Sequence, residues 1–185
     1  MESFPIRLAT VEDLPAIVGL ANWAAAHTTA NFALEPESVD EWRATYLRSE
    51  RLHAWLVAVD AGEVVGFAKT SPHRSRAAYD WTAETTIYLR DSHFGRGLGT
   101  QLYTRLLAIA AAQGYVALLA GITAGHAASE ALHRKLGFQK VAHFARLGWK
   151  FGAWHDVGYW ELLLADEAPP RPILPVATVL ERMVL

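Results

Sequence analysis

Apolar positions near the start of the chain recur at helical spacing, which predicts that residues 1–50 are mostly helical. Residues 6–8 alternate as a short strand does, and Thr10 with Asp13 resembles the start of a helix. Beyond that start, apolar side chains recur three or four positions apart, at Leu14, Ile17, Val18 and Ala21. Ser38 and Glu41 then have the spacing of a capping box, which predicts the start of a second helix.

The middle of the chain predicts a meander of strands followed by a long helix. Residues 54–59 and 64–69 are apolar and β-branched, with turn residues between them, so we expect a hairpin. A loop over 70–80 and a strand over 81–89 come next. The long helix is expected to end at Gly114. Its predicted buried face carries Leu102, Leu106, Ile109 and Ala110.

The last part of the chain predicts three more strands, one helix and an extended arm. These elements are expected, in order, at residues 116–122, 129–136, 139–147 and 157–164. This order predicts an α/β fold with a mixed sheet. Because prolines crowd the end of the chain, we expect one domain over residues 1–166 and a proline-rich C-terminal arm over 167–185, packed on the domain or on a dimer partner.

Composition narrows the class of protein. The chain has 185 residues, of which 52% are hydrophobic, enough for one domain with a sizeable core. Its formal net charge is -2, whereas a nucleic-acid surface needs clustered Lys and Arg, so no nucleic-acid partner is expected. The absence of cysteine excludes disulfides, thiolate metal sites and Cys nucleophiles. We see no secretion signal and no apolar run of bilayer length, so we expect a cytoplasmic protein and no membrane partner.

Glycines cluster where the long helix is expected to begin, between Phe94 and Thr100. Glycines at 95, 97 and 99 let backbone N–H groups converge on one point, where the helix N-terminus adds partial positive charge. We expect a pyrophosphate there, with Arg96 as a counter-charge. A strand-to-helix turn without a ligand explains the glycines equally well. The segment lacks the Gly-Lys-Ser/Thr ending of a Walker loop and the third glycine of a dinucleotide fingerprint.

Further segments, in order along nearly the whole chain, form a more specific pattern. They are Asn31-Phe32 with Glu35-Pro36, Ala78 to Glu84, Leu102-Tyr103-Thr104, Leu132-His133 with Leu136-Gly137-Phe138, Trp154 to Gly158, and Pro169 to Pro172. This pattern resembles the phosphinothricin and methionine-sulfoximine N-acetyltransferases of the GNAT superfamily. The glycine turn is similar to the coenzyme A loop of that superfamily, Gln/Arg-x-x-Gly-x-Gly/Ala, except that Phe94 stands at its first position.

The resemblance implies the GNAT fold, an α/β fold in which helices flank a twisted mixed sheet with splayed central parallel strands. The gap between those strands would admit the pantetheine arm of acetyl-CoA. Backbone groups of Ile87, Tyr88 and Leu89 would meet the pantetheine, and His126 stands where relatives often carry an Asn that contacts coenzyme A. The residues that would hold the pyrophosphate are Gly95, Arg96, Gly97, Leu98, Gly99 and Thr100.

Acetyl transfer to an amine needs a proton acceptor, because a free α-ammonium is mostly charged at neutral pH. The resemblance places the catalytic carboxylate at Glu84, for which a solvated strand glutamate is the alternative. His133 is the second catalytic candidate, since many relatives carry there a tyrosine that protonates the thiolate and phosphinothricin-type enzymes carry histidine. A helix histidine bonded to its neighbours explains His133 equally well. His155 competes for the same role, but a structural hydrogen bond in a short polar turn with Asp156 explains it better.

Three side chains that can be cationic lie within residues 73–76, and Arg grips a carboxylate or phosphinate with paired hydrogen bonds. A solvated loop is the alternative. The expected substrate-binding residues are Asn31, Phe32, Arg74, Arg76 and Tyr79. Ala24 and Ala33 stand where the family tends to have Tyr and Arg, which changes the pocket and favours a different amino-acid analogue as acceptor.

The function that the resemblance implies is acetyl-CoA-dependent N-acetylation, by direct attack, of a small amino-acid-like substrate such as phosphinothricin, methionine sulfoximine or methionine sulfone. A GNAT acetyltransferase for a polyamine, an aminoglycoside or a peptide N-terminus is one alternative, and a non-catalytic CoA-binding regulatory module is another. Relatives form twofold dimers, which implies a homodimer. The histidines lack ligand spacing with carboxylates, so we expect no metal.

Overall fold

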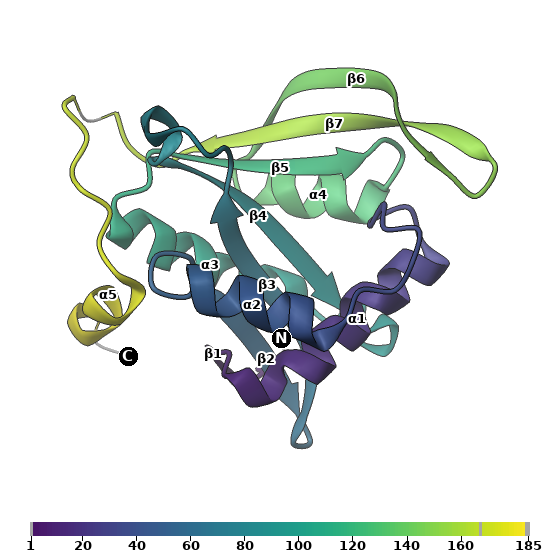
Figure 1. Cartoon of the computed structure of the whole chain (residues 1–185), viewed down its shortest axis with the longest axis horizontal. Coiled ribbons are helices and arrows are strands. Elements are labelled where there is room, and N and C mark those ends of the chain that lie inside the picture. Colours follow the sequence, from purple (N-terminus) through teal and green to yellow (C-terminus); the bar gives the residue numbers. More distant parts are fainter. Residues whose placement is uncertain (1, 167, 184–185) are drawn as a thin grey trace.

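The computed structural model describes residues 2–166 and 168–183, within which seven strands form one sheet in the order β1-β2-β3-β4-β5-β7-β6 (Figure 1). The strands are β1 (Ile6–Leu8), β2 (Trp55–Asp60), β3 (Glu63–Pro72), β4 (Thr82–Leu89), β5 (Ala117–Thr123), β6 (Gln139–Lys150) and β7 (Ala153–Leu163). The helices are α1 (Leu14–His27), α2 (Val39–Ser49), α3 (Leu98–Gln113), α4 (Ala127–Lys135) and α5 (Val176–Arg182). Neighbouring strands are antiparallel except β4 and β5, which are parallel, so the sheet is mixed as predicted.

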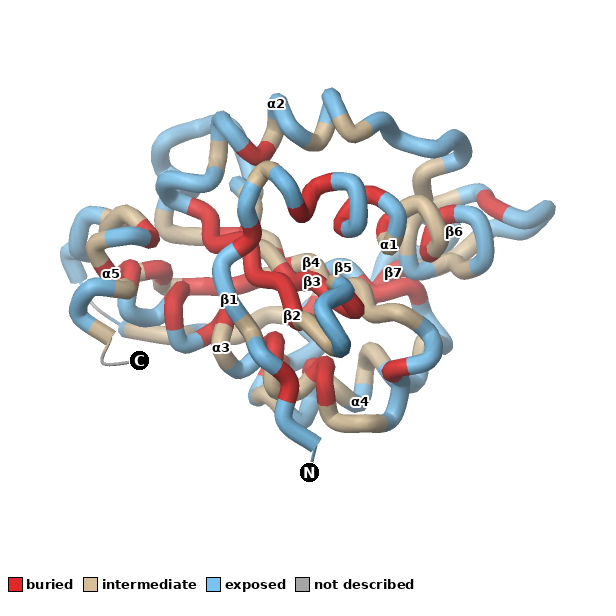
Figure 2. The backbone as a smooth tube through the Cα atoms, turned by 90° about the horizontal axis from the view of Figure 1, so that it is seen from below, coloured by how far each residue is buried: buried red, intermediate tan, exposed pale blue. Residues whose placement is uncertain are grey.

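Helices cover both faces of this sheet, with α1 and α2 on one side and α3 and α4 on the other (Figure 2). The two faces explain why the sequence of β2 is almost continuously apolar. Trp55 and Val57 pack with the residues of α1 and α2, whereas Leu56 and Ala58 pack with those of α3. Successive side chains of a strand point to opposite faces, and here each face meets a hydrophobic cluster.

The central strands β4 and β5 pair over a short stretch and then separate. Their parallel pairing involves only Thr82, Ala83 and Glu84 of β4. Beyond Glu84, β4 continues to Leu89 and β5 continues to Thr123, with no pairing between them. This confirms the splayed pair of parallel strands that the resemblance implies.

Glycine marks both ends of α3, the long helix of the sequence prediction. Gly97 caps the N-terminus with φ +84° and Gly114 caps the C-terminus with φ +100°. Residues with a side chain adopt such left-handed conformations at a cost. The predicted buried face is confirmed, since Leu102, Leu106, Ile109 and Ala110 are fully buried.

Three strands, β3, β6 and β7, extend beyond their predicted bounds, because their ends pair with neighbouring strands. The end of β6 runs to Lys150, beyond the predicted end at residue 147, and pairs there with the start of β7. Strand β3 runs to Pro72, inside the predicted loop over 70–80, where its last residues pair with β4. The predicted short polar turn around His155 and Asp156 is wrong, because both residues lie in β7. The chain reverses instead at Phe151 and Gly152, both with positive φ.

The C-terminal arm passes the end of α3 and contains α5. The Trp81 Nε1 donates to the carbonyl of Arg171 at 2.6 Å, and Gln113 Nε2 donates to that of Leu174 at 2.9 Å. Val176 and Val179 of α5 are buried in the core. The predicted arm begins at residue 167, and this residue and residues 184–185 lie outside the described residues. The division of the chain into a domain and an arm therefore stays a prediction. None of the described helices is long and apolar enough to cross a membrane.

Candidate active site

A cavity of about 580 Å³ lies where β4 and β5 separate. It is bordered by both strands, by the start of α3, by α4, and by α1 with the loop that follows it, so it reaches elements on both faces of the sheet. The predicted cofactor residues that line it are Ile87, Tyr88, Leu89, Gly95, Gly97, Gly99, Thr100 and His126. Arg96 and Leu98 do not line it, and Leu98 is buried in the core instead.

The turn that precedes α3 presents backbone to this cavity. Gly95 and Gly97 have φ values of +74° and +84°, a conformation that turns successive peptide groups toward one side. Within the described part of the chain, no side chain caps the N-terminus of α3. The first N–H groups of the helix therefore remain available to an anion, and the helix dipole favours one.

The cation beside this turn is Lys135, which the sequence analysis did not single out. Its Nζ lies 3.4 Å from Oγ1 of Thr100 in the first turn of α3, and both residues line the cavity. The side chain of Arg96 pairs instead with the carboxylate of Glu2 at 2.5 Å and lies over the ring of Phe4. Lys135 therefore supplies the positive side chain on the cavity side of the turn.

His126 caps the N-terminus of α4 and also lines the cavity. Its Nδ1 is buried and has no hydrogen-bond partner among the described residues. A buried polar atom without a partner costs free energy, so this nitrogen is suited to bind a polar group of a ligand in the cavity.

His133 and Tyr103 form a buried pair in the cavity wall. The His133 Nδ1 lies 2.8 Å from the carbonyl oxygen of Ser129, which can only accept, so Nδ1 carries the proton. The Nε2 is left without a proton, 3.0 Å from the hydroxyl oxygen of Tyr103. That hydroxyl donates to Oγ1 of Thr85, whose own hydroxyl donates to the carbonyl of Leu119. Burial lowers the pKa of His133, while the Ser129 carbonyl opposes this, and burial raises the pKa of Tyr103. Both groups are therefore uncharged at neutral pH.

Glu84 stands at the point where the central strands part, as the last residue of β4 paired with β5. Tyr88 packs in the cluster of α1 and α2, so Glu84, four residues earlier on the same strand, points to that face. Thr85 points to the opposite face, where it meets Tyr103. Glu84 itself does not line the cavity, although Thr85 and Thr86 do. Its Oε1 lies 2.8 Å from Nδ1 of His73.

The predicted substrate-binding residues fall into two groups. Arg74 and Tyr79 lie beside His73, and the Arg74 guanidinium carbon is 5.6 Å from the centre of the Tyr79 ring. Arg76 caps the 3₁₀ turn that contains Tyr79. Asn31 and Phe32 belong to the loop between α1 and α2. The first group is linked to Glu84 through His73, whereas no hydrogen bond or ring contact among the described residues links the second group to Glu84.

Lys69 is a further cation on the face of the sheet toward which Glu84 points, and the sequence analysis missed it. Its Nζ lies 4.7 Å from the centre of the Trp55 ring and 5.6 Å from that of Trp42. Burial lowers the pKa of Lys69, while the carboxylates of Glu37 and Glu84 oppose this. Its sequence signal is a charge that directly follows the apolar run of residues 64–68.

Lys150 fastens the loop of Asn31 and Phe32 to the end of β6. Its Nζ donates to the carbonyls of Asn31 at 2.6 Å and Ala33 at 3.0 Å, and also to that of Ala25. Next to this anchor, the ring of Phe32 lies 6.1 Å from that of His155, centre to centre. His155 Nε2 lies 2.9 Å from the carbonyl oxygen of Lys150 itself. His155 therefore bonds to the backbone of the hairpin, whereas its expected partner Asp156 pairs with His143.

Known proteins resemble this chain over nearly its whole length. The chain is 39% identical over 174 residues to the phosphinothricin N-acetyltransferase of Streptomyces viridochromogenes, an overlap of 94% of this chain and 95% of that protein. It is also 39% identical over 164 residues to the L-methionine sulfoximine/L-methionine sulfone acetyltransferase of Pseudomonas aeruginosa, which covers 88% and 95% of the two chains.

Solved structures agree with these relatives. An acetyltransferase of Salmonella typhimurium, solved with acetyl-CoA, superposes with a TM-score of 0.87 at 34% identity, over 92% of this chain and 99% of its own. A GNAT superfamily phosphinothricin acetyltransferase of Sinorhizobium meliloti, also in complex with acetyl-CoA, has a TM-score of 0.85 at 29% identity, over 92% and 94% of the two chains. The model of the acetyltransferase (GNAT) family matches residues 17–138, the part that carries the splayed strands, the glycine turn and His133, and the chain belongs to that family.

Proposed function

We propose that this protein transfers the acetyl group of acetyl-CoA to the amine of a small amino-acid-like substrate, such as phosphinothricin, methionine sulfoximine or methionine sulfone. The observation that carries the proposal is the arrangement at the splay of β4 and β5, where the cavity and the glycine turn meet the strand that bears Glu84. The names of the relatives support the class of acceptor.

Acetyl-CoA supplies an activated acetyl group as a thioester, and this chain has the groups to hold it. The N–H groups at the start of α3 and the ammonium of Lys135 suit the pyrophosphate. The backbone of residues 87–89 borders the cavity where β4 has left β5, and this backbone suits the amide-rich pantetheine. The orphan Nδ1 of His126 suits a further polar contact.

The two substrates would approach from opposite faces of the sheet. Glu84 points to the α1 side and would take one proton from the acceptor ammonium. The freed nitrogen lone pair then forms a bond to the acetyl carbon, the carbon–sulfur bond breaks, and no covalent enzyme intermediate is needed. The second proton that the nitrogen loses would neutralise the departing thiolate. We assign its transfer to the hydroxyl of Tyr103 on the other face, which would give its proton to the thiolate and regain one from the nitrogen, with Nε2 of His133 beside it as a proton acceptor.

The basic loop after β3 favours an acceptor with an acidic group. Arg74 would grip a carboxylate or phosphinate, with Tyr79 and Arg76 on the same turn, and Asn31 and Phe32 would contribute from the loop between α1 and α2. A polyamine or aminoglycoside would instead favour an acidic pocket.

We also propose a twofold homodimer built on the hairpin of β6 and β7. This hairpin projects from the body of the molecule (Figure 1). Its large exposed apolar side chains are Val141, Phe144, Leu147, Trp149, Phe151, Trp154 and Leu163. Such a concentration of exposed aromatic and aliphatic groups is typical of an interface. The cytoplasmic location and the absence of a nucleic-acid partner stay predictions from composition.

The test is turnover of acetyl-CoA with a panel of amino acids, their sulfone, sulfoximine and phosphinate analogues, polyamines and aminoglycosides, followed through release of free thiol. We expect amino-acid analogues to be acetylated. Glu84→Gln should lower kcat by about a hundredfold or more at neutral pH while leaving the Kd for acetyl-CoA unchanged. Binding of acetyl-CoA without turnover of any amine would contradict the proposal and favour a regulatory module.

A further inference from the structure

The imidazole of His73 is held on three sides at the end of β3. Its Nδ1 lies 2.8 Å from Oε1 of Glu84, and its Nε2 lies 3.4 Å from Nε of Arg74. The ring of Tyr79 meets it edge-on, with 5.7 Å between ring centres. The side chain of His73 is only 16% exposed. Both ring nitrogens and the ring itself are therefore restrained, which leaves the imidazole a single orientation.

These contacts decide which nitrogen carries the proton. An arginine side chain can only donate, so Nε2 of His73 accepts from Arg74. The neutral ring then has its proton on Nδ1 and donates it to Oε1 of Glu84. A protonated ring would turn an N–H toward the guanidinium, and the contact with Arg74 would be lost. Two hydrogen bonds thus run in one direction, from Arg74 through His73 to Glu84.

The side chain of Glu84 is exposed enough to change its conformation unless a partner restrains it. Its side chain is 40% exposed, and a long carboxylate side chain at that exposure exchanges among rotamers unless a partner fixes it. The titratable and charged groups around it are His73 from the loop, Arg74 behind that ring, and Lys69 from β3. Of these three, only His73 forms a hydrogen bond with the Glu84 carboxylate.

We propose that His73 is the positioning residue of the general base. Its Nδ1–H occupies Oε1 of Glu84 and leaves Oε2 as the oxygen that takes the proton of the acceptor ammonium. The ammonium N–H bond breaks and an Oε2–H bond forms, and no proton passes through His73. The inference rests on the proposed function, because that function makes Glu84 the base. Arg74 holds Nε2 of His73, and in the proposed function Arg74 also binds the anion of the acceptor. The loop of His73 and Arg74 would therefore both bind the acceptor and orient the base.

The first test asks whether His73 acts only through Glu84. We expect His73→Ala to lower kcat for the acceptor about tenfold and to leave the KM for acetyl-CoA unchanged. In the Glu84→Gln background, the same substitution should cost less than about twofold, because the carboxylate that it positions is gone. His73→Asn should recover most of the activity, since its amide N–H can stand where Nδ1–H does. Equal losses in the two backgrounds, or no recovery with Asn, would overturn the proposal.

His143 provides a matched control. It forms a histidine–carboxylate pair of similar length with Asp156, 2.9 Å, on the hairpin of β6 and β7. The variant His143→Ala removes the same kind of bond away from Glu84, and we expect its kcat to equal that of the wild type. If His143→Ala also lowered kcat about tenfold, the loss of any such histidine–carboxylate pair would be lowering activity through the fold. That result would contradict the positioning role of His73.

The second test does not depend on turnover. Nitrogen-15 NMR of the wild type, with His73 assigned by comparison with His73→Asn, should show the Nδ1–H tautomer. An Nε2–H signal would overturn the proposal even in an active enzyme. A wild type that acetylates no amine would instead overturn the proposed function, and an Nδ1–H signal would then still support the bond from His73 to the carboxylate.

Discussion

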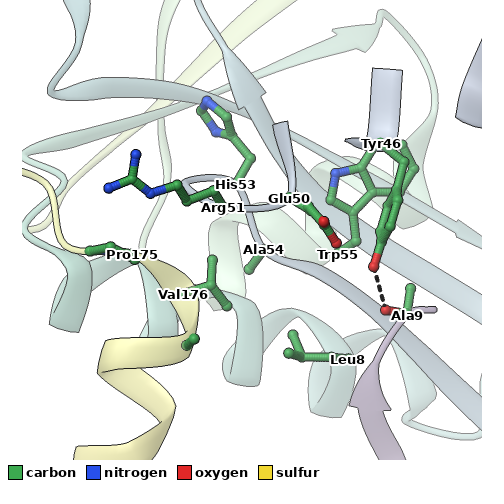
Figure 3. Close-up of a pocket in the computed structure, with 11 residues that line it drawn as sticks. Leu8, Ala9, Tyr46, Glu50, Arg51, His53, Ala54, Trp55, Pro175 and Val176 are labelled. Carbon is green, nitrogen blue, oxygen red and sulfur yellow. Dashed lines mark hydrogen bonds between the residues drawn. The ribbon is translucent and has the colours of Figure 1, made fainter. Parts of the chain in front are cut away.

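His53 provides a prediction about stability whose size follows from its surroundings. The residue is 9% exposed, it stacks on Tyr115, and it borders the smaller cavity, of about 290 Å³, between β1, α2 and α5 (Figure 3). Burial, with a smaller contribution from Lys69, lowers the pKa of His53 from 6.5 to about 4. The unfolded chain therefore takes up a proton between these two values while the folded chain does not. Stability is lost as the pH falls through this window.

The fall of about 2.5 in the pKa corresponds to about 3 kcal/mol, of which about 2.5 kcal/mol is lost between about pH 7.5 and pH 4.5. The perturbation is His53→Gln, which keeps a polar side chain and removes the titration. We would measure the free energy of unfolding of both proteins in urea at the two pH values. The advantage of the wild type over the variant should shrink by about 2.5 kcal/mol on acidification. Titrating groups other than His53 contribute equally to the stability of both proteins, so their contributions cancel in this comparison. A difference that changes by less than about 0.5 kcal/mol would refute the reasoning.

Three further predictions concern the site. Lys135→Ala should raise the Kd for acetyl-CoA about threefold to tenfold by calorimetry, with a weaker effect at high salt, and an unchanged Kd would remove Lys135 from the phosphate site. Arg74→Ala should raise the acceptor KM about tenfold and leave that of acetyl-CoA unchanged; equal effects on both would point to misfolding. In Gly148→Ala the new Cβ would lie 2.5 Å from Phe32, so we expect a higher acceptor KM, and a normal KM would place Phe32 outside the acceptor pocket.

The sequence predicted best those elements whose signals are local. The two glycines that bound α3 need left-handed backbone, and the capping box of Ser38 and Glu41 forms as its spacing indicates. The ends of β3 and β7 could not be placed, because a strand ends where its partner ends. The partner residues of β3 lie on β4 and those of β7 on β5 and β6, so the pairing register is a property of the assembled sheet.

The contrast between local signals and contacts between distant residues also holds for the site. Glycines and a helix start predicted the left-handed turn before α3, because that geometry belongs to the backbone. The cation of the turn was predicted at Arg96, its neighbour in sequence, whereas Lys135 reaches Thr100 from 35 residues away. His73 reaches Glu84 across 11 residues, and Tyr103 reaches His133 across 30. Such pairs form only when strands and helices have met, and one sequence carries no signal of them.

The proposed coenzyme side of the site is formed by backbone and the proposed acceptor side by loop side chains. This difference affects the specificity for the acceptor. The proposed coenzyme side consists of backbone on β4, β5 and the start of α3, fixed by the sheet and by glycine conformations. The proposed acceptor side consists of side chains on two loops, one fastened by Lys150 and the other by the pair of His73 and Glu84. Loops accept substitutions that a sheet does not. Glu84 joins the halves, because its backbone ends the pairing of β4 with β5 and its carboxylate is held by a loop residue. Under the proposed mechanism, a change of acceptor can therefore occur in the loops while Glu84 keeps its place where β4 and β5 separate.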